Sequence, residues 1–292
     1  MKLKKNNPDQ LTINGLNILS VTEKETPPPS AIKWSGGKRS CARSIARFLP
    51  KAKCFYEPFF GGGSVLFCRK DSKSVASDLY GPLVDFWMLV KNDAPGLIAN
   101  YARQWAKLQM DLPGYFYVVR ERFNQRPNGY DLCFLSRTCV NGIIRFNDDG
   151  KFNNSFHLSR KGMTPDRFER AILSWSERLK TVDVRCCDYT ESASMARKGD
   201  LVYMDPPYFG SKQRYISDLN IDNLLETLES LNKRDVRWAL SFDGMRGEAD
   251  YRFAMPKELF KQEVDVRTGL SAVTKVLNGA AEHVTEKLYL NF

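Results

Sequence analysis

An aspartate, two prolines and a tyrosine end one short apolar run, in the stretch LVYMDPPYFG at Leu201–Gly210. The apolar residues predict a buried strand. Proline cannot donate the hydrogen bond that would continue it, so the strand must end at Asp205. In open α/β sheets, ligands bind outside the carboxyl ends of the strands. Asp205 is therefore a candidate active-site acid.

The chemistry that suits this group is transfer to an exocyclic amine. The lone pair of such an amine is conjugated with its ring, and hydrogen bonds to a fixed carboxylate and a carbonyl favour the tetrahedral nitrogen that attacks. Asp205 and the carbonyl of Pro206 can accept those two bonds, and Tyr208 can stack on the base. A base in a duplex must first be flipped out of the stack.

A glycine-rich turn, in YEPFFGGGSVLF at Tyr56–Phe67, lies between a predicted strand and a predicted helix. Bare backbone there lets a ligand approach closely, although a simple tight turn would have the same sequence. The turn is not a dinucleotide fingerprint, because Leu66 stands where the third glycine belongs. KWSGGKRS is not a P-loop, because Ile32 stands where the first glycine belongs.

Asp78 ends the next predicted strand, where an acid commonly receives the hydroxyls of a ribose. With both phosphate-cradling motifs incomplete, the expected ligand has a ribose but lacks a diphosphate. S-adenosylmethionine (SAM) fits that description.

The chain is basic, with 44 lysines and arginines against 34 acids and a formal net charge of +10. A polyanion such as nucleic acid is the natural partner, although a basic balance also aids solubility. Basic and aromatic residues alternate in RERFNQR (Arg120–Arg126), IIRFNDDGKF (Ile143–Phe152) and HLSRKG (His157–Gly162). Such segments suit phosphate contact and base stacking, but a solvated helix face would look similar.

The seven cysteines form no CxxC pair and the chain has two histidines, so zinc-ligand spacing is absent and no metal is expected. An odd number of cysteines on apolar segments favours reduced, buried thiols. The N-terminal residues contain no continuous apolar core, and no later segment has a membrane-spanning length. The sequence therefore predicts a cytoplasmic protein without membrane contact.

Short strand patterns alternate with helix patterns, which predicts a three-layer α/β sheet. One helix is expected to begin after Thr164, and another spans Asn220–Asn232. The expected strands are Lys53–Phe60, Ser74–Asp78, Val182–Tyr189, Leu201–Met204, Val236–Asp243, Gln262–Val266 and Glu286–Phe292.

The alternation breaks between Asp78 and Val182, where helical, aromatic and basic sequence predicts an inserted second domain. We expect residues 1–30 to be an arm or linker. Residues 31–84 and 181–292 would form the sheet domain, and residues 85–180 the insert. Within the insert, Asn141-Gly142 and Asp149-Gly150 are turn signals, and the second predicts a hairpin. A hairpin carrying Arg145 and Lys151 suits groove reading, and an ordinary surface hairpin is the alternative.

Four motifs in this chain resemble, in the same order, those of the Dam-like (D12 class) DNA adenine-N6 methyltransferases. They are KWSGGK, EPFFGGGSV, the SD of Ser77-Asp78, and DPPY. The resemblance runs from Lys33 to Phe292. It implies a Rossmann-like methyltransferase three-layer sandwich with a mainly helical target-recognition domain that carries a β-hairpin.

The resemblance also implies site residues. The residues implied for the SAM site are Trp34, Lys38, Glu57, Gly61, Asp78, Asp188 and Asp205. Those implied for DNA contact are Lys33, Asn141, Arg145 and Lys151. The implied catalytic residues are those of DPPY, namely Asp205, Pro206 and Tyr208.

The implied activity is methyl transfer from SAM to the N6 amine of adenine at a specific, GATC-like sequence of duplex DNA, by base flipping. The chain departs from the family pattern at Val140, where an aromatic residue is usual, and at Asn154-Ser155, where a proline is usual. An RNA adenine methyltransferase and a catalytically silent DNA-binding homologue are the alternatives. Besides duplex DNA, a restriction endonuclease is a candidate partner, and a monomer is expected.

Overall fold

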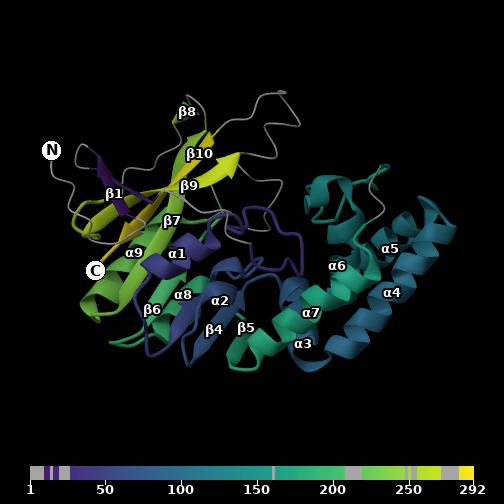
Figure 1. Ribbon diagram of the computed structural model, residues 1–292, viewed down its shortest axis with the longest axis horizontal. Coiled ribbons are helices and arrows are strands. Elements are labelled where there is room, and N and C mark those ends of the chain that lie inside the picture. The colour runs from purple at the N-terminus through teal and green to yellow at the C-terminus, as the bar shows by residue number, and fades with distance from the viewer. Residues whose placement is uncertain are drawn as a thin grey trace.

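The computed structural model describes residues 10–13, 16–19, 27–159, 162–207, 219–246, 249–250, 255–270 and 283–292. Within them, one sheet has the strand order β1-β2-β9-β10-β7-β6-β3-β4-β5, with β8 paired to β7 (Figure 1). Five of these strands run parallel, and β10 lies antiparallel between β7 and β9. The parallel strands are β3 (Phe55–Glu57), β4 (Ser74–Asp78), β5 (Val182–Cys186), β6 (Leu201–Met204) and β7 (Arg237–Arg246). The others are β1 (Gln10–Ile13), β2 (Leu16–Leu19), β8 (Ala249–Asp250), β9 (Gln262–Leu270) and β10 (His283–Leu290).

The strand β6 shows why the apolar runs form strands. All four of its residues are fully buried, as expected for a parallel strand with helices on both faces. Leu201 and Tyr203 belong to one hydrophobic core, and Val202 and Met204 belong to another. Because side chains alternate between the faces of a strand, the sheet separates two cores. This confirms the predicted three-layer arrangement.

The helices fall on the two faces accordingly. α8 (Tyr189–Ser194) and α9 (Ile221–Lys233) contribute to the core of Val202 and Met204. α1 (Ala42–Phe48), α2 (Ser64–Cys68), α3 (Gly81–Asn92) and α7 (Pro165–Leu179) contribute to the other. As predicted, α7 has Thr164 at its N-cap and Pro165 in its first turn.

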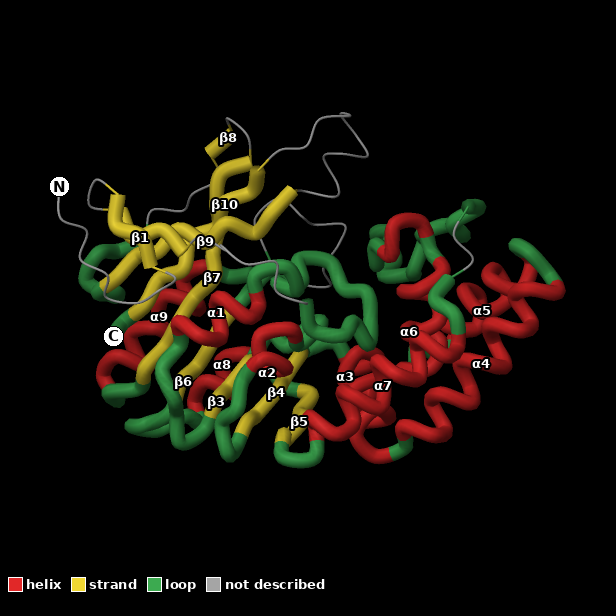
Figure 2. The backbone as a smooth tube through the Cα atoms, in the orientation of Figure 1, coloured by secondary structure: helices red, strands yellow, loops and turns green. Residues whose placement is uncertain are grey.

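The insert consists of helices and loops (Figure 2). It contains α4 (Ala94–Met110), α5 (Gly114–Gln125), α6 (Gly129–Thr138) and the 3₁₀ turn η1 (Val140–Gly142). One continuous core runs from the sheet into these helices and includes Trp87 of α3, Trp175 of α7 and Phe134 of α6. The expected boundary at residue 85 falls inside α3. This helix therefore fixes the insert to the sheet.

The predicted hairpin turn forms at Asn147–Gly150, where the Gly150 N–H donates to the Asn147 carbonyl oxygen. Gly150 has φ of +71°, which matches a three-residue loop that ends in a left-handed residue. The two arms meet in an isolated bridge of Phe146 with Phe152 rather than in continuous strands, and a second bridge joins Phe156 to Cys139, which precedes η1. We call residues 143–156 the hairpin.

The N-terminal segment differs from the expected arm. Within residues 1–30, β1 and β2 pair antiparallel, and β2 adds parallel to β9 at the edge of the sheet. The sequence signal for this pair is Asn14-Gly15, a favoured hairpin dipeptide between two apolar runs. The proline-rich stretch that follows is typical of a linker, and it favoured the interpretation of the whole segment as an arm.

Candidate active site

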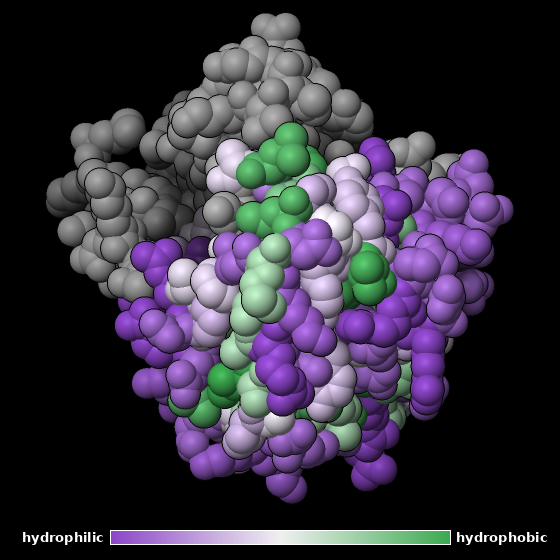
Figure 3. Space-filling view, turned by 90° about the vertical axis from the view of Figure 1, so that its right-hand side faces the viewer, coloured by the Kyte–Doolittle hydropathy of each residue, from purple (hydrophilic) through white to green (hydrophobic). Residues whose placement is uncertain are grey.

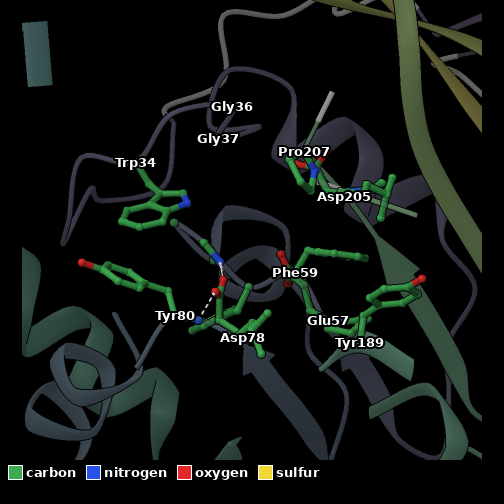
Figure 4. Close-up of a pocket in the computed structure, with 18 of the residues that line it drawn as sticks. Trp34, Gly36, Gly37, Glu57, Phe59, Asp78, Tyr80, Tyr189, Asp205 and Pro207 are labelled. Carbon is green, nitrogen blue, oxygen red and sulfur yellow. Dashed lines mark hydrogen bonds between the residues drawn. The ribbon is translucent and has the colours of Figure 1, made fainter. Parts of the chain in front are cut away.

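A cavity of about 420 Å³ lies at the carboxyl ends of β3, β4 and β6 (Figure 4). The strand order reverses between β3 and β6, because the chain continues from β3 to β4 on one side and from β6 to β7 on the other. This topological switch point is where α/β sheets open a crevice for ligands. Three acids line it from neighbouring strands: Glu57 ends β3, Asp78 ends β4, and Asp205 follows β6.

Asp78 is held by backbone donors. Its Oδ2 accepts from the Gly61 N–H at 2.9 Å, and its Oδ1 accepts from the Tyr80 N–H at 3.1 Å. Burial raises the pKa of the Asp78 carboxyl group, and the backbone hydrogen bonds oppose that rise. The side chain is thus fixed between the glycine turn and the start of α3 (Figure 4).

Gly61 allows Trp34 to lie against the glycine turn. The φ of Gly61 is +47°, and a Cβ built there would lie 2.9 Å from Cδ1 of Trp34. The indole N–H of Trp87 donates to the Gly61 carbonyl oxygen at 3.0 Å, which holds the turn from below. The rings of Trp34 and Tyr80 stand 6.0 Å apart and form one aromatic wall (Figure 4).

Lys38 and Asp205 form a nearly buried ion pair. The Lys38 Nζ lies 2.6 Å from Oδ1 of Asp205 and donates to the Gly36 carbonyl oxygen at 3.3 Å. Their side chains are 3% and 15% exposed. A charged hydrogen bond of this length orients the carboxylate strongly.

Glu57 is buried beside this pair. Its Oε2 accepts from the Leu66 N–H of α2 at 2.8 Å. Burial is the main cause that raises the pKa of Glu57 well above 4.5, and the negative charge of Asp205 adds to the rise. Glu57 therefore keeps its proton to a higher pH than an ordinary glutamate.

Asp188 lines the cavity at the start of α8. Its Oδ1 accepts from the Thr190 N–H at 2.9 Å and from the Thr190 hydroxyl at 2.6 Å, so it caps that helix. The neighbouring Tyr189 stacks on Phe59 at 4.9 Å. Burial raises the pKa of Tyr189 to about 12.

The structure brings together every residue expected in the SAM site, because all seven line this cavity. Pro206 lines it as well. Tyr208 lies outside the described residues. Among the lining residues that the sequence did not single out are Phe59, Tyr80, Phe146, Tyr189, Asn220 and Asn223. Tyr80 and Tyr189 each follow a predicted acid within two positions, which is the signal that could have found them.

Phe146 comes from the hairpin and lines the cavity. Its ring packs edge-on against Tyr80, with centroids 5.7 Å apart. No local sequence pattern links these positions.

The residues expected to contact DNA do not line the cavity. Asn141 lies in η1 with φ of +56°, and Lys33 packs against the adjacent Gly142. Arg145 is exposed and its Nε donates to the Asn153 Oδ1 at 3.0 Å, while Lys151 is exposed near the hairpin turn. These four residues therefore lie on η1, the hairpin and the loop against them.

Within the described ranges, no cluster of three or more histidine, cysteine, aspartate or glutamate side chains is placed to hold a metal ion. In the same part of the chain, no helix combines the length and the apolar character needed to cross a bilayer.

The strand order and the cavity at the switch point define a Rossmann-like methyltransferase fold of the SAM-dependent type. The D12 class N6 adenine-specific DNA methyltransferase family matches residues 34–245, and this chain belongs to it.

The chain is also similar in sequence to individual DNA adenine methylases. The chain is 30% identical over 181 residues to a DNA adenine methylase of Serratia marcescens, covering 61% of this chain and 66% of the relative. The DNA adenine methylase of Escherichia coli (strain K12) is likewise 30% identical, covering 61% and 64%. A DNA N-6-adenine-methyltransferase of Escherichia phage P1 is 31% identical over 186 residues, covering 61% and 24%.

The matched region thus spans less than two thirds of the length of these relatives. Among solved structures, the rRNA methyltransferase aviRa from Streptomyces viridochromogenes is 12% identical, with a TM-score of 0.39. That match covers 87% of this chain and 84% of the other.

Proposed function

We propose that this protein transfers a methyl group from SAM to the N6 amine of adenine in a specific sequence of duplex DNA. The observation that carries the proposal is the position of Asp205 and Pro206. They follow β6 and line a cavity at the switch point of the sheet, in a member of an adenine methyltransferase family.

The lining of the cavity suits SAM. Its volume of about 420 Å³ is in the range of small-molecule sites. Asp78 and Asp188 line it and are held by backbone donors rather than by cations, so its charge favours a cationic ligand. The aromatic faces of Trp34 and Tyr80 suit a cation as well. SAM, when bound, supplies a methyl group on a positively charged sulfur.

In this proposal Trp34, Gly61 and Asp78 hold the cofactor, with Asp78 accepting from ribose hydroxyls. Glu57, Lys38 and Asp188 complete that site. The carboxylate of Asp205 and the carbonyl oxygen of Pro206 accept hydrogen bonds from the adenine amine. Lys38 orients Asp205 through their ion pair.

The amine nitrogen becomes tetrahedral as it attacks, and these two fixed acceptors stabilise it at that stage. The proton that the nitrogen loses passes to Asp205 or to water. Tyr208 would stack on the base.

The adenine must leave the duplex to reach this site, at a cost of a few kcal/mol. We propose that residues 85–180 recognise the DNA and that η1 and the hairpin read the sequence, with Arg145 and Lys33 in base contact and Asn141 and Lys151 nearby. The exposure of Arg145 supports this role. A GATC-like site, a restriction endonuclease partner, a monomeric state, a cytoplasmic location and the absence of a metal stay predictions from the sequence.

The test is to incubate the protein with methyl-labelled SAM and unmethylated duplex DNA, and to identify the labelled nucleoside after digestion. We expect label in N6-methyladenine, and a loss of at least about 100-fold in Asp205→Asn. Asp183→Asn is the matched control, because Asp183 is exposed and pairs with Arg185 away from the cavity.

Full labelling by Asp205→Asn would show that Asp205 does not take part in methyl transfer.

RNA is the alternative substrate, and it is tested by letting duplex DNA and RNA compete for the label. Preferential labelling of RNA would contradict the DNA proposal.

A further inference from the structure

A second cavity, of about 470 Å³, lies in the inserted domain between α4, α5 and the start of α6. It shares no lining residue with the candidate active site. Four cations and one acid line it, whereas four acids and one cation line the active site. The two cavities therefore favour ligands of opposite charge.

The one acid that lines this cavity, Asp131, is paired with an arginine. Asp131 is buried and accepts from both Nε and Nη2 of Arg122, the first bond being 2.8 Å long. Asn128 also donates to Asp131, at 3.0 Å. Gln104, 5% exposed, accepts from the Arg122 guanidinium at 3.3 Å and donates to Asn100 at 2.7 Å. The floor of the cavity is thus a fixed polar network.

The other three cations that line the cavity lie outside this network. Arg103, Lys107 and Arg126 are exposed, and in the part of the chain that the structure describes none of them forms an ion pair. The Lys107 ammonium lies 5.7 Å from the ring centre of Tyr115. Three positive charges therefore line the cavity without an ion-pair partner of their own among the described residues.

Two of these cations repel each other along one helix. Arg103 and Lys107 are four residues apart on α4, whereas Arg126 is the C-cap residue after α5. A like-charged pair at that spacing opposes helix formation by about 0.2–0.5 kcal/mol, partly offset because Lys107 lies in the last turn, where a cation is favoured. A bound anion would relieve this repulsion.

We propose that this cavity binds phosphate groups of the DNA backbone that flanks the recognised sequence. Arginine guanidinium groups bind phosphate through paired hydrogen bonds, which suits Arg103 and Arg126. The outward side of the inserted domain is mostly hydrophilic, with small hydrophobic areas (Figure 3).

The position of α5 supports DNA as the source of the phosphate. On one side α5 holds the hairpin, because Asn124 exchanges hydrogen bonds with the backbone of Phe152 and Arg120 donates to the carbonyl oxygen of Asn154. On another side it lines the cavity. One helix is about 10–12 Å across, and the major groove is about 12 Å wide, so a backbone bordering the groove is within reach. This step rests on the proposed function.

The experiment uses the double variant Arg103→Gln/Arg126→Gln, which keeps the Arg122–Asp131 pair. The matched control is Arg167→Gln/Arg170→Gln, two exposed arginines of α7 outside the cavity. Kd for duplex DNA is measured against salt concentration with a duplex of about 30 base pairs and one of about 10, three turns and one turn. Unfolding followed by circular dichroism checks that each variant is folded.

We expect the cavity variant to bind the long duplex more weakly, with the salt slope reduced by about 1–2, and the short duplex as the wild type does. The control variant should match the wild type on both. Equal slopes for the cavity variant and the control on the long duplex would overturn the DNA assignment.

A second arm measures inorganic pyrophosphate binding by calorimetry without DNA. Binding that the cavity variant loses supports a phosphate site, and with unchanged duplex binding it assigns the site to a small phosphorylated ligand. If neither pyrophosphate nor duplex binding differs between the two double variants, the cavity is not a phosphate site. A wild-type protein that binds no duplex would contradict the proposed function instead, and the pyrophosphate arm would still test the cavity.

Discussion

The Lys38 ammonium lies 2.6 Å from Oδ1 of Asp205, although the two residues are 167 positions apart in the chain. The contact joins the loop before α1 to the segment after β6. It places a positive charge beside the acid that the proposed mechanism needs ionised. Because Lys38 binds Oδ1, the contact also fixes the orientation of the Asp205 carboxylate.

Replacing Lys38 by methionine should lower methyl transfer more than cofactor binding. The carboxylate of Asp205 would lose its orienting partner, and misplacement of about 1 Å can cost up to about 100-fold in rate. We expect kcat to fall by about 10–100-fold, with a smaller change in Kd for SAM. Lys38→Arg, which keeps the charge, should recover part of the rate. Equal kcat in wild type and Lys38→Met would show that the ion pair is structural.

Gly61→Ala should weaken SAM binding. The φ of +47° disfavours any side chain, and the new Cβ would lie 2.9 Å from Trp34. Gly150→Ala is a matched control, because Gly150 has φ of +71° but open space around a Cβ. Both variants should lose about 1–2 kcal/mol of stability from backbone strain. Only Gly61→Ala should raise Kd for SAM in a calorimetric titration, and a similar rise in Gly150→Ala would contradict a local role.

Glu57→Gln should change how stability depends on pH. The pKa of Glu57 is higher in the folded chain than in the unfolded chain, so folding takes up a proton between the two values. The contribution of Glu57 to stability is therefore complete below about pH 4.5 and falls as pH rises toward the folded pKa, by up to about 1.4 kcal/mol per pH unit.

Glutamine cannot ionise, and its oxygen can still accept from Leu66. The free energy of unfolding in urea, measured from about pH 5 to 8, should fall less steeply in Glu57→Gln than in the wild type. Parallel curves would mean that Glu57 is ionised in the folded protein. Asp78, whose pKa is also raised, contributes in the same direction in both proteins.

Asn154→Leu should loosen η1 and reduce sequence discrimination. The Asn154 amide is buried and donates to the carbonyl oxygens of Val140 at 3.0 Å and Ile143 at 2.8 Å. Leucine has a similar size but cannot donate, so both carbonyl oxygens lose the amide donor, although the Val140 oxygen still accepts from the Ile143 N–H, and the cost is about 1–3 kcal/mol. The ratio of Kd values for the recognised duplex and a one-base variant should fall, and Kd for SAM should not change. Ser155→Ala is the neighbouring control.

Arg69→Met should destabilise the sheet domain strongly. The buried guanidinium bonds both oxygens of Asp71 and the carbonyl oxygens of Leu49 and Pro50, the last two at 2.8 Å. Its loss leaves a buried carboxylate unpaired, which costs about 3–5 kcal/mol. The double variant Arg69→Met/Asp71→Leu should be more stable than Arg69→Met in chemical unfolding. The opposite order would mean that the carboxylate is not the source of the loss.

The strands and the acids that follow them could be predicted from the sequence. Ser74–Asp78 and Leu201–Met204 form strands with the predicted bounds, because short apolar runs ended by a polar residue or proline have few alternatives. The parallel strands then bring Glu57, Asp78 and Asp205 to one edge. This follows from topology alone, once the strand order is known.

The aromatic walls could not be predicted in the same way. Phe146 reaches the cavity because the helices of the insert set the angle of the hairpin, and no periodicity in the sequence encodes that angle. The basic cavity depends on the packing of α4 against α5. The positive charge of this cavity could be predicted from the segment RERFNQR. The sequence does not indicate that Arg120 contacts the hairpin while Arg122 and Arg126 line the cavity beside α4.

Phe146 belongs to the hairpin and also forms part of the wall of the SAM-sized cavity, where it packs against Tyr80. Any displacement of the hairpin by DNA therefore displaces a wall of the cavity. Linkage then requires a reciprocal effect: the factor by which DNA changes the affinity for the cofactor equals the factor by which the cofactor changes the affinity for DNA. Phe146 thus gives the hairpin a direct contact with the cavity wall, through which DNA binding and cofactor binding are coupled.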